Sequence, residues 1–397
     1  MSERRGEVPA PPAGAGRPPR VVVENVKPEV SDGRFPIKRT VGERVIVEAD
    51  AYAEGHDALV AVVRYRRDSD STWSEAPMEP LGNDRWRGSF AIDALEPYRY
   101  TVEAWVDPFA TWRRGLERKL EVRSVEPVDL LVGAALVDDA AGRASGDEAS
   151  WLGAVAAALR EDGSVEGRAA RALDPQLLAL VARHPDRSAA GRHRAELLVS
   201  VDRERARFSS WYELFPRSTA PEPGRHGTFR DVEARLPYVA SMGFDVLYLP
   251  PIHPVGRVHR KGKNNAVEAG PDDVGSPWAI GSAEGGHDAI HPQLGTLEDF
   301  HRLLQRARDR GLELALDLAF QCAPDHPWVN EHPQWFRRRP DGSIQYAENP
   351  PKRYQDIYPI DFETEDWRAL WSALLGVVRL WMERGVRIFR VDNPHTK

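Results

Sequence analysis

The sequence contains a single cysteine, Cys322, among its 397 residues. One thiol cannot form an intramolecular disulfide, so a disulfide-stabilised fold is excluded and a reducing compartment, the cytoplasm, is expected. The chain also lacks any run of about 18 apolar residues, which predicts that no helix crosses a membrane. Its first residues are rich in proline, glycine and arginine and lack the apolar core of a signal peptide.

An excess of positive charge is absent too, because 54 basic residues face 61 acidic ones and the net charge is −7. This balance gives no support for binding to nucleic acid or to an anionic membrane surface, so neither partner is expected. The histidines are scattered, without an HExxH motif or paired cysteines, and no metal or other cofactor is expected. A glycine-rich phosphate loop is missing as well, so side chains must hold any phosphate.

The residues that are present divide the chain into four segments. Residues 1–20 are rich in proline and glycine and are expected to be disordered. Residues 21–126 alternate short period-two runs with turns, which is typical of a β-sandwich. Residues 127–201 have helical spacing and predict a small helical bundle that packs against a partner surface or subunit. Residues 202–397 alternate strand-like and helix-like runs.

This last segment predicts four units of strand followed by helix. The expected strands cover residues 209–215, 244–249, 312–320 and 386–391. Alternating strands and helices favour a parallel sheet, and both a doubly wound sheet and a (β/α)8 barrel fit the pattern. Long polar loops follow the second and third strands, where barrel enzymes build their sites. We therefore expect the first half of a (β/α)8 catalytic barrel in an α/β chain that begins with a β-sandwich.

The last expected strand brings Arg390 and Asp392 to its carboxyl end. Side chains alternate along a strand, so these two point to the same side and the arginine favours an ionised carboxylate. An ionised aspartate at the end of a barrel strand is what a glycosidase-type nucleophile requires. A structural Arg–Asp pair that closes a strand explains this segment alone equally well.

Three blocks, residues 244–251, 317–326 and 385–395, resemble the α-amylase superfamily of retaining α-glycan enzymes in order and spacing. Two further segments, residues 260–265 and 348–356, narrow the resemblance to the α-1,4-glucan:maltose-1-phosphate maltosyltransferases. Enzymes of this family carry a β-sandwich and a helical insert before the barrel and work as homodimers. The resemblance implies transfer of maltosyl units from maltose 1-phosphate to the non-reducing ends of α-1,4-glucans.

The resemblance also implies roles for individual residues. Asp392 matches the nucleophile, which forms a glycosyl-enzyme, and Arg390 matches its partner. The donor-sugar contacts matched are Lys261, Gln321, Asp356 and Asn393, and Asn265 lies in the same polar string as Lys261. The region that holds the donor phosphate is matched by Asn349, Lys352 and Tyr354. The acid/base glutamate and a third aspartate are expected after Lys397, so this chain alone is not expected to turn over.

Two departures and two alternatives accompany this interpretation. Gln321 stands where most amylases have asparagine, and Asp392 is followed by Asn-Pro-His. A glucan hydrolase or branching enzyme would use the same scaffold, although the segment 352–354 argues against it. A non-catalytic glucan-binding fragment that uses the β-sandwich is the other alternative. His291 and His326 fit sugar ligands and ordinary loop histidines equally well.

Overall fold

The computed structural model describes residues 19–161 and 163–394. The chain divides after Arg207 into two compact units, which are described separately. The expected disordered segment, residues 1–20, lies outside the described residues except for its last two positions. Among the described helices, none has the length and apolar character needed to cross a membrane.

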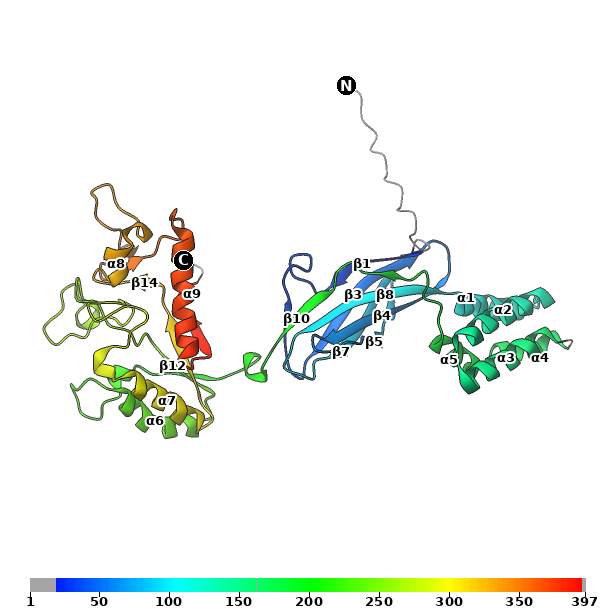
Figure 1. Cartoon of the computed structure of the whole chain (residues 1–397), viewed down its shortest axis with the longest axis horizontal. Helices are drawn as coiled ribbons and strands as arrows, with labels where there is room; N and C mark the ends of the chain where they lie inside the picture. Colours follow the sequence, from blue (N-terminus) through cyan, green and yellow to red (C-terminus); the bar gives the residue numbers. More distant parts are fainter. Residues whose placement is uncertain (1–18, 162, 395–397) are drawn as a thin grey trace, which may run out of the picture. The chain divides into compact units, whose positions relative to one another are not determined.

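The first unit contains two sheets (Figure 1). One sheet has the order β1-β3-β7-β6, and the other has the order β2-β10-β8-β4-β5 with β9 paired to β8. The strands are β1 (Val21–Lys27), β2 (Ile37–Thr40), β3 (Arg44–Ala53), β4 (Ala58–Arg67), β5 (Ser74–Pro77), β6 (Glu79–Gly82), β7 (Arg85–Ala91), β8 (Tyr98–Asp107), β9 (Gly191–Arg192) and β10 (Leu197–Asp202). Strand β3 shows why they pack: Val45, Val47 and Ala49 are buried while the residues between them are more exposed. Both sheets contribute to one core, which confirms the predicted sandwich.

Five helices form a separate small core in this unit. They are α1 (Pro108–Glu121), α2 (Pro127–Arg143), α3 (Gly146–Arg160), α4 (Val165–Ala172) and α5 (Pro175–Arg183). The helical part starts at Pro108 rather than at the expected residue 127, because Asp107 caps α1 directly after β8. After α5 the chain returns to the sandwich, and β10 pairs with both β2 and β8. The helices are thus inserted between strands of one sheet.

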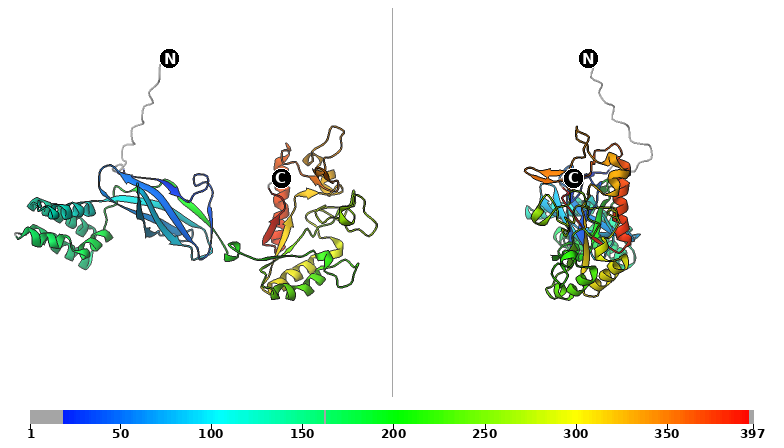
Figure 2. Two further views of the ribbon diagram at one scale, coloured as in Figure 1. Left: turned by 180° about the vertical axis from the view of Figure 1, so that it is seen from behind. Right: turned by 90° about the vertical axis from the view of Figure 1, so that its left-hand side faces the viewer.

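The second unit is built on a parallel four-stranded sheet of order β11-β12-β13-β18. Its strands are β11 (Trp211–Glu213), β12 (Val246–Leu249), β13 (Glu313–Leu318) and β18 (Ile388–Val391), and its long helices are α6 (Phe229–Ser241), α7 (Leu297–Arg308) and α9 (Trp367–Glu383). These helices pack with leucines of β12 and β13 in one core. Figure 2 shows the ribbon of this unit from two further sides. Strands that follow each other in sequence are neighbours in the sheet, whereas a doubly wound sheet reverses its strand order. The fold is therefore part of a barrel.

Two long connections leave the carboxyl ends of β12 and β13. The first covers residues 250–295 and is mostly irregular. The second contains α8 (Pro327–Glu331) and two small antiparallel pairs, β14 (Gln321–Cys322) with β17 (Tyr358–Pro359) and β15 (Ala347–Asn349) with β16 (Lys352–Tyr354). The β15–β16 pair is called the 347–354 hairpin below. Both connections lie where a barrel enzyme builds its site.

Candidate active site

A guanidinium group joins two carboxylates at the ends of adjacent strands. Arg390 Nη1 donates to Asp392 Oδ1 at 2.6 Å and to Asp317 Oδ2 at 3.1 Å. Asp317 and Arg390 are register partners in β13 and β18, so the parallel pairing itself brings them together. The backbone amide of Asp392 also donates to the Leu318 carbonyl at 3.0 Å, which fixes where the chain leaves the sheet.

Two aromatic side chains complete the surroundings of Asp317. The Tyr248 hydroxyl donates to Asp317 Oδ2, and Trp278 Nε1 donates to the same oxygen at 3.3 Å. Burial raises the pKa of Asp317, and burial together with the neighbouring carboxylate raises the pKa of Tyr248. Asp317 Oδ1 has no hydrogen-bond partner among the described residues. Sequence reasoning noted Asp317 within a motif but missed Tyr248 and Trp278. Tyr248, as a polar-tipped side chain inside an apolar strand, was the available signal.

Seven of the predicted site residues line one cavity of about 850 Å³. They are Asn265, Gln321, Asn349, Tyr354, Asp356, Asp392 and Asn393. These residues come from both long connections and from the end of β18, which are distant in sequence. The walls are rich in carboxylates, carboxamides and aromatic rings, a combination that suits a polyhydroxylated ligand such as a sugar.

Individual contacts orient the polar groups of this cavity. Asn393 has φ +46°, in the left-handed region that asparagine tolerates, and its Nδ2 donates to Asp392 Oδ2 at 3.3 Å. Side chains of Arg390 and Asn393 thus donate to the two different carboxylate oxygens of Asp392. Gln321 Nε2 donates to the Trp278 carbonyl at 3.0 Å. Asp356 is buried, its Oδ1 has no partner among the described residues, and burial raises its pKa.

Three predicted site residues do not line this cavity. Arg390 lies behind Asp392 and acts on it through the ion pair. Lys261 is buried, and its Nζ donates to the Arg353 carbonyl at 3.2 Å and to Gln355 Oε1 at 2.9 Å. Lys352 is exposed on β16, where it is the register partner of Asn349.

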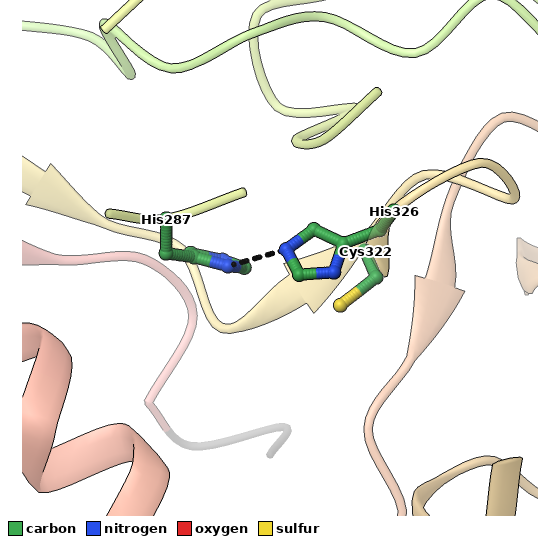
Figure 3. A group of neighbouring side chains, drawn as sticks. All are labelled: His287, Cys322 and His326. Atoms are coloured by element: carbon green, nitrogen blue, oxygen red, sulfur yellow. Dashed lines mark hydrogen bonds between the residues drawn. The ribbon is translucent and has the colours of Figure 1, made fainter. Parts of the chain in front are cut away.

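His287, Cys322 and His326 offer ligand atoms that lie within 4.8 Å of one another (Figure 3). His326 Nδ1 accepts from the Trp328 amide at 3.0 Å, which assigns the ring proton of a neutral imidazole to Nε2. That nitrogen lies 3.1 Å from His287 Nδ1, and His287 Nε2 lies 2.9 Å from the Ala319 carbonyl. The rings thus form a directed hydrogen-bond chain that leaves no ring lone pair for a metal. Burial lowers the pKa of His326 to about 2 and raises that of the Cys322 thiol.

His291 also lies away from the 850 Å³ cavity. Its Nδ1 accepts from the Gln293 amide at 3.2 Å, and its ring stacks on His226 at a centroid distance of 5.4 Å. His291 and His326 thus both make local contacts within the long connections and lie outside the 850 Å³ cavity.

Comparison with known proteins agrees with these two units. Residues 19–203 match the family model described as alpha-1,4-glucan:maltose-1-phosphate maltosyltransferase, domain N/S. Residues 211–372 match the model described as alpha amylase, catalytic domain. The second unit is thus part of an α-amylase-type catalytic domain.

Similar chains carry the name alpha-1,4-glucan:maltose-1-phosphate maltosyltransferase. The one from Chlorobaculum tepidum is 54% identical over 95% of this chain and 56% of its own length. The one from Myxococcus xanthus is 53% identical over 95% of this chain and 58% of its own. A solved α-amylase from Lactobacillus plantarum is 31% identical over 46% of this chain and 38% of its own, with a TM-score of 0.38. The chain is similar to these α-1,4-glucan:maltose-1-phosphate maltosyltransferases over nearly all of its own length, and it spans less than two thirds of theirs.

Proposed function

We propose that this chain carries the donor-binding part of a maltosyltransferase active site. The reaction is the retaining transfer of a maltosyl unit from α-maltose 1-phosphate to the non-reducing end of an α-1,4-glucan. The observation that carries the proposal is the carboxylate of Asp392, oriented by Arg390 and Asn393 at the wall of a polar cavity. The names of its relatives support the choice of donor and acceptor.

Retaining transfer uses two carboxyl groups about 5–5.5 Å apart. One attacks the anomeric carbon and displaces the leaving group, which forms a glycosyl-enzyme. The other protonates the leaving group and later deprotonates the acceptor hydroxyl. We assign the first role to Asp392 and the second to the part of the relatives that this chain does not span. Asp317 accepts hydrogen bonds from Arg390 and Tyr248, so we assign it a role in orienting the arginine that holds Asp392.

The 347–354 hairpin is proposed to recognise the donor phosphate. Asn349 and Tyr354 line the cavity, and the exposed Lys352 has no ion-pair partner among the described residues. An ammonium, a carboxamide and a phenol supply the donors that a phosphate dianion accepts. A hydrolase or branching enzyme would have no charged leaving group for Lys352 to bind, which favours the phosphorylated donor.

The proposal includes a cytoplasmic homodimer. Helix α2 exposes Val128, Leu131 and Val132 on one face, at the spacing that places side chains next to each other on a helix. An apolar stripe of this kind suits contact with a second copy of the chain.

Capture of the glycosyl-enzyme tests the proposed role of Asp392. We expect a full-length protein carrying this chain to gain one maltosyl unit by intact-mass spectrometry when given a slow maltosyl donor. Asp392→Ala should gain none and should lose transfer, because the attacking carboxylate is gone. Lys352→Ala is the matched control, since it should still form the adduct from α-maltosyl fluoride. An adduct that persists in Asp392→Ala would show that another group is the nucleophile.

A further inference from the structure

Lys261 is a buried cation whose partners are neutral. Its residue is 6% exposed, and it has no ion pair among the described residues. Instead its ammonium donates to the Arg353 carbonyl and to Gln355 Oε1, at 3.2 and 2.9 Å. Burying a charge is costly unless it is well satisfied, so a lysine held in this way points to a specific task.

The acceptors of Lys261 belong to the 347–354 hairpin and to the residue next to it. The hairpin has three register pairs, and the Ala347 amide adds one bond to the Ile357 carbonyl at 2.8 Å. No residue from 347 to 356 belongs to a hydrophobic core cluster of the described chain. A two-stranded hairpin without a packed face is marginally stable by itself. Within the described residues, the two bonds from Lys261 are the hydrogen bonds that join the 250–295 connection to this hairpin, at Arg353, and to the adjoining Gln355.

Asp356 lies beside this contact and lines the sugar cavity. Burial raises the pKa of its carboxyl group, and the charges of Lys261 and His259 oppose that shift. Lys261 does not line that cavity itself; it lines a neighbouring cavity of about 440 Å³ and bonds Gln355, the residue before Asp356.

We propose that Lys261 is a positioning residue that holds the 347–354 hairpin and Asp356 against the sugar cavity. Its ammonium acts as a cross-link between the two long connections, and the hairpin then presents Asn349, Lys352 and Tyr354 in a fixed arrangement. This role differs from the direct sugar contact that the family resemblance implies. Its consequence for the donor phosphate rests on the proposed function, whereas the cross-link itself does not.

Hydrogen exchange of the chain without ligand tests the cross-link. Lys261→Met keeps the length of the side chain and removes the ammonium. We expect the amides of residues 347–357 to exchange about tenfold faster or more, since two charge-assisted hydrogen bonds are lost. Lys263→Met is the matched control, because Lys263 is exposed on the same connection and, among the described residues, its side chain makes no hydrogen bond or ion pair with the hairpin. Equal exchange in both variants and the parent chain would overturn the proposal.

A second variant keeps the test decisive if Lys261→Met fails to fold. Gln355→Leu removes one acceptor and leaves Lys261 in place, so a smaller acceleration confined to residues 347–357 supports the proposal, and none overturns it. Calorimetry with maltose 1-phosphate and with maltose then tests the cross-link and the proposed phosphate site separately. Faster exchange with a selective loss of maltose 1-phosphate binding supports both proposals. Faster exchange with equal effects on both ligands leaves the cross-link standing and removes the phosphate site from the hairpin.

Discussion

The ammonium of Lys352 is the charge through which the proposed site distinguishes a phosphorylated donor from a neutral one. Maltose 1-phosphate has a dianionic leaving group near neutral pH, whereas a glucan donor has none. The described residues that line the 850 Å³ cavity include Glu348, Asp356 and Asp392 but no lysine or arginine. The cavity wall alone would therefore repel a dianion, and a cation at its rim must offset that repulsion.

Replacing Lys352 by alanine should weaken use of maltose 1-phosphate selectively. We expect kcat/KM for this donor to fall roughly tenfold to hundredfold in the full-length protein, because one charge-assisted hydrogen bond is lost. Transfer from α-maltosyl fluoride, whose leaving group carries no phosphate, should fall much less. Arg353→Ala is the matched control, since it removes a neighbouring exposed cation and keeps the carbonyl that Lys261 uses. Equal losses with both donors would assign Lys352 to the fold or to the sugar site.

The residue scale also shows what sequence reasoning could reach. The alternation of side chains along one strand was enough to place Arg390 beside Asp392, because the two residues are only two positions apart in sequence. The link from Arg390 to Asp317 depends on the register between two strands that lie 73 residues apart, which no local pattern encodes. Lys261 is a similar case, since its partners lie 92 and 94 residues away.

At the scale of elements, the long connections are held by buried neutral histidines. His253 Nδ1 lies 2.9 Å from the Ala289 carbonyl, and His287 and His326 continue the chain of imidazoles toward α8. Burial lowers the pKa of His253 to about 3 and that of His326 to about 2. Burial disfavours the charged form of these imidazoles, so the connections that carry the site are most stable when the rings are unprotonated.

Acid should therefore destabilise the second unit well above the pH at which its carboxylates titrate. The unfolded histidines have a pKa of about 6.5, so between pH 6.5 and about 4 the unfolded state binds more protons than the folded state. The free energy of unfolding is highest above pH 6.5. As the pH is lowered below 6.5, it decreases by up to about 1.4 kcal/mol per pH unit for each such histidine.

Urea unfolding followed by tryptophan fluorescence from pH 7 to 4.5 measures this slope. His253→Asn should reduce this slope by up to about 1.4 kcal/mol per pH unit, the contribution of one histidine, because the amide can donate to the Ala289 carbonyl without titrating. His301→Asn is the control, since His301 lies on α7 with an exposed side chain. A slope that His253→Asn leaves unchanged would contradict the neutral-histidine account.

Across the whole molecule, the order of the four segments followed from composition and periodicity, and the strand order of the second unit decided between the two sheet architectures. The return of the chain to the sandwich did not follow. Strand β10 is six residues long and carries both apolar and polar side chains, so its local pattern is weak. Its place is set by pairing with β2 and β8, which lie about a hundred residues or more earlier in the chain. Local periodicity does not reveal pairings over such a distance.

This topology predicts where the first unit can be cut. Residues 19–207 should fold as one cooperative unit, whereas residues 19–126 should not. The shorter piece lacks β10, which fills the place between β2 and β8 and buries Leu197 and Val199 in the sandwich core. Burying one such side chain contributes about 1.5–3 kcal/mol, and a typical domain has only about 5–15 kcal/mol in total.

Thermal melting and size-exclusion chromatography of the two pieces test this topology. We expect a single sharp transition and a discrete elution peak for residues 19–207, and aggregation or a broad transition for residues 19–126, whose β2 and β8 would present open edges. Leu197→Ala in the longer piece should lower its stability by about 2–5 kcal/mol, since it empties a core position. Glu196→Ala, at the exposed neighbouring position, should change it little. A shorter piece that melts as cooperatively as the longer one would mean that β10 is dispensable and that the sandwich is complete before its helices begin.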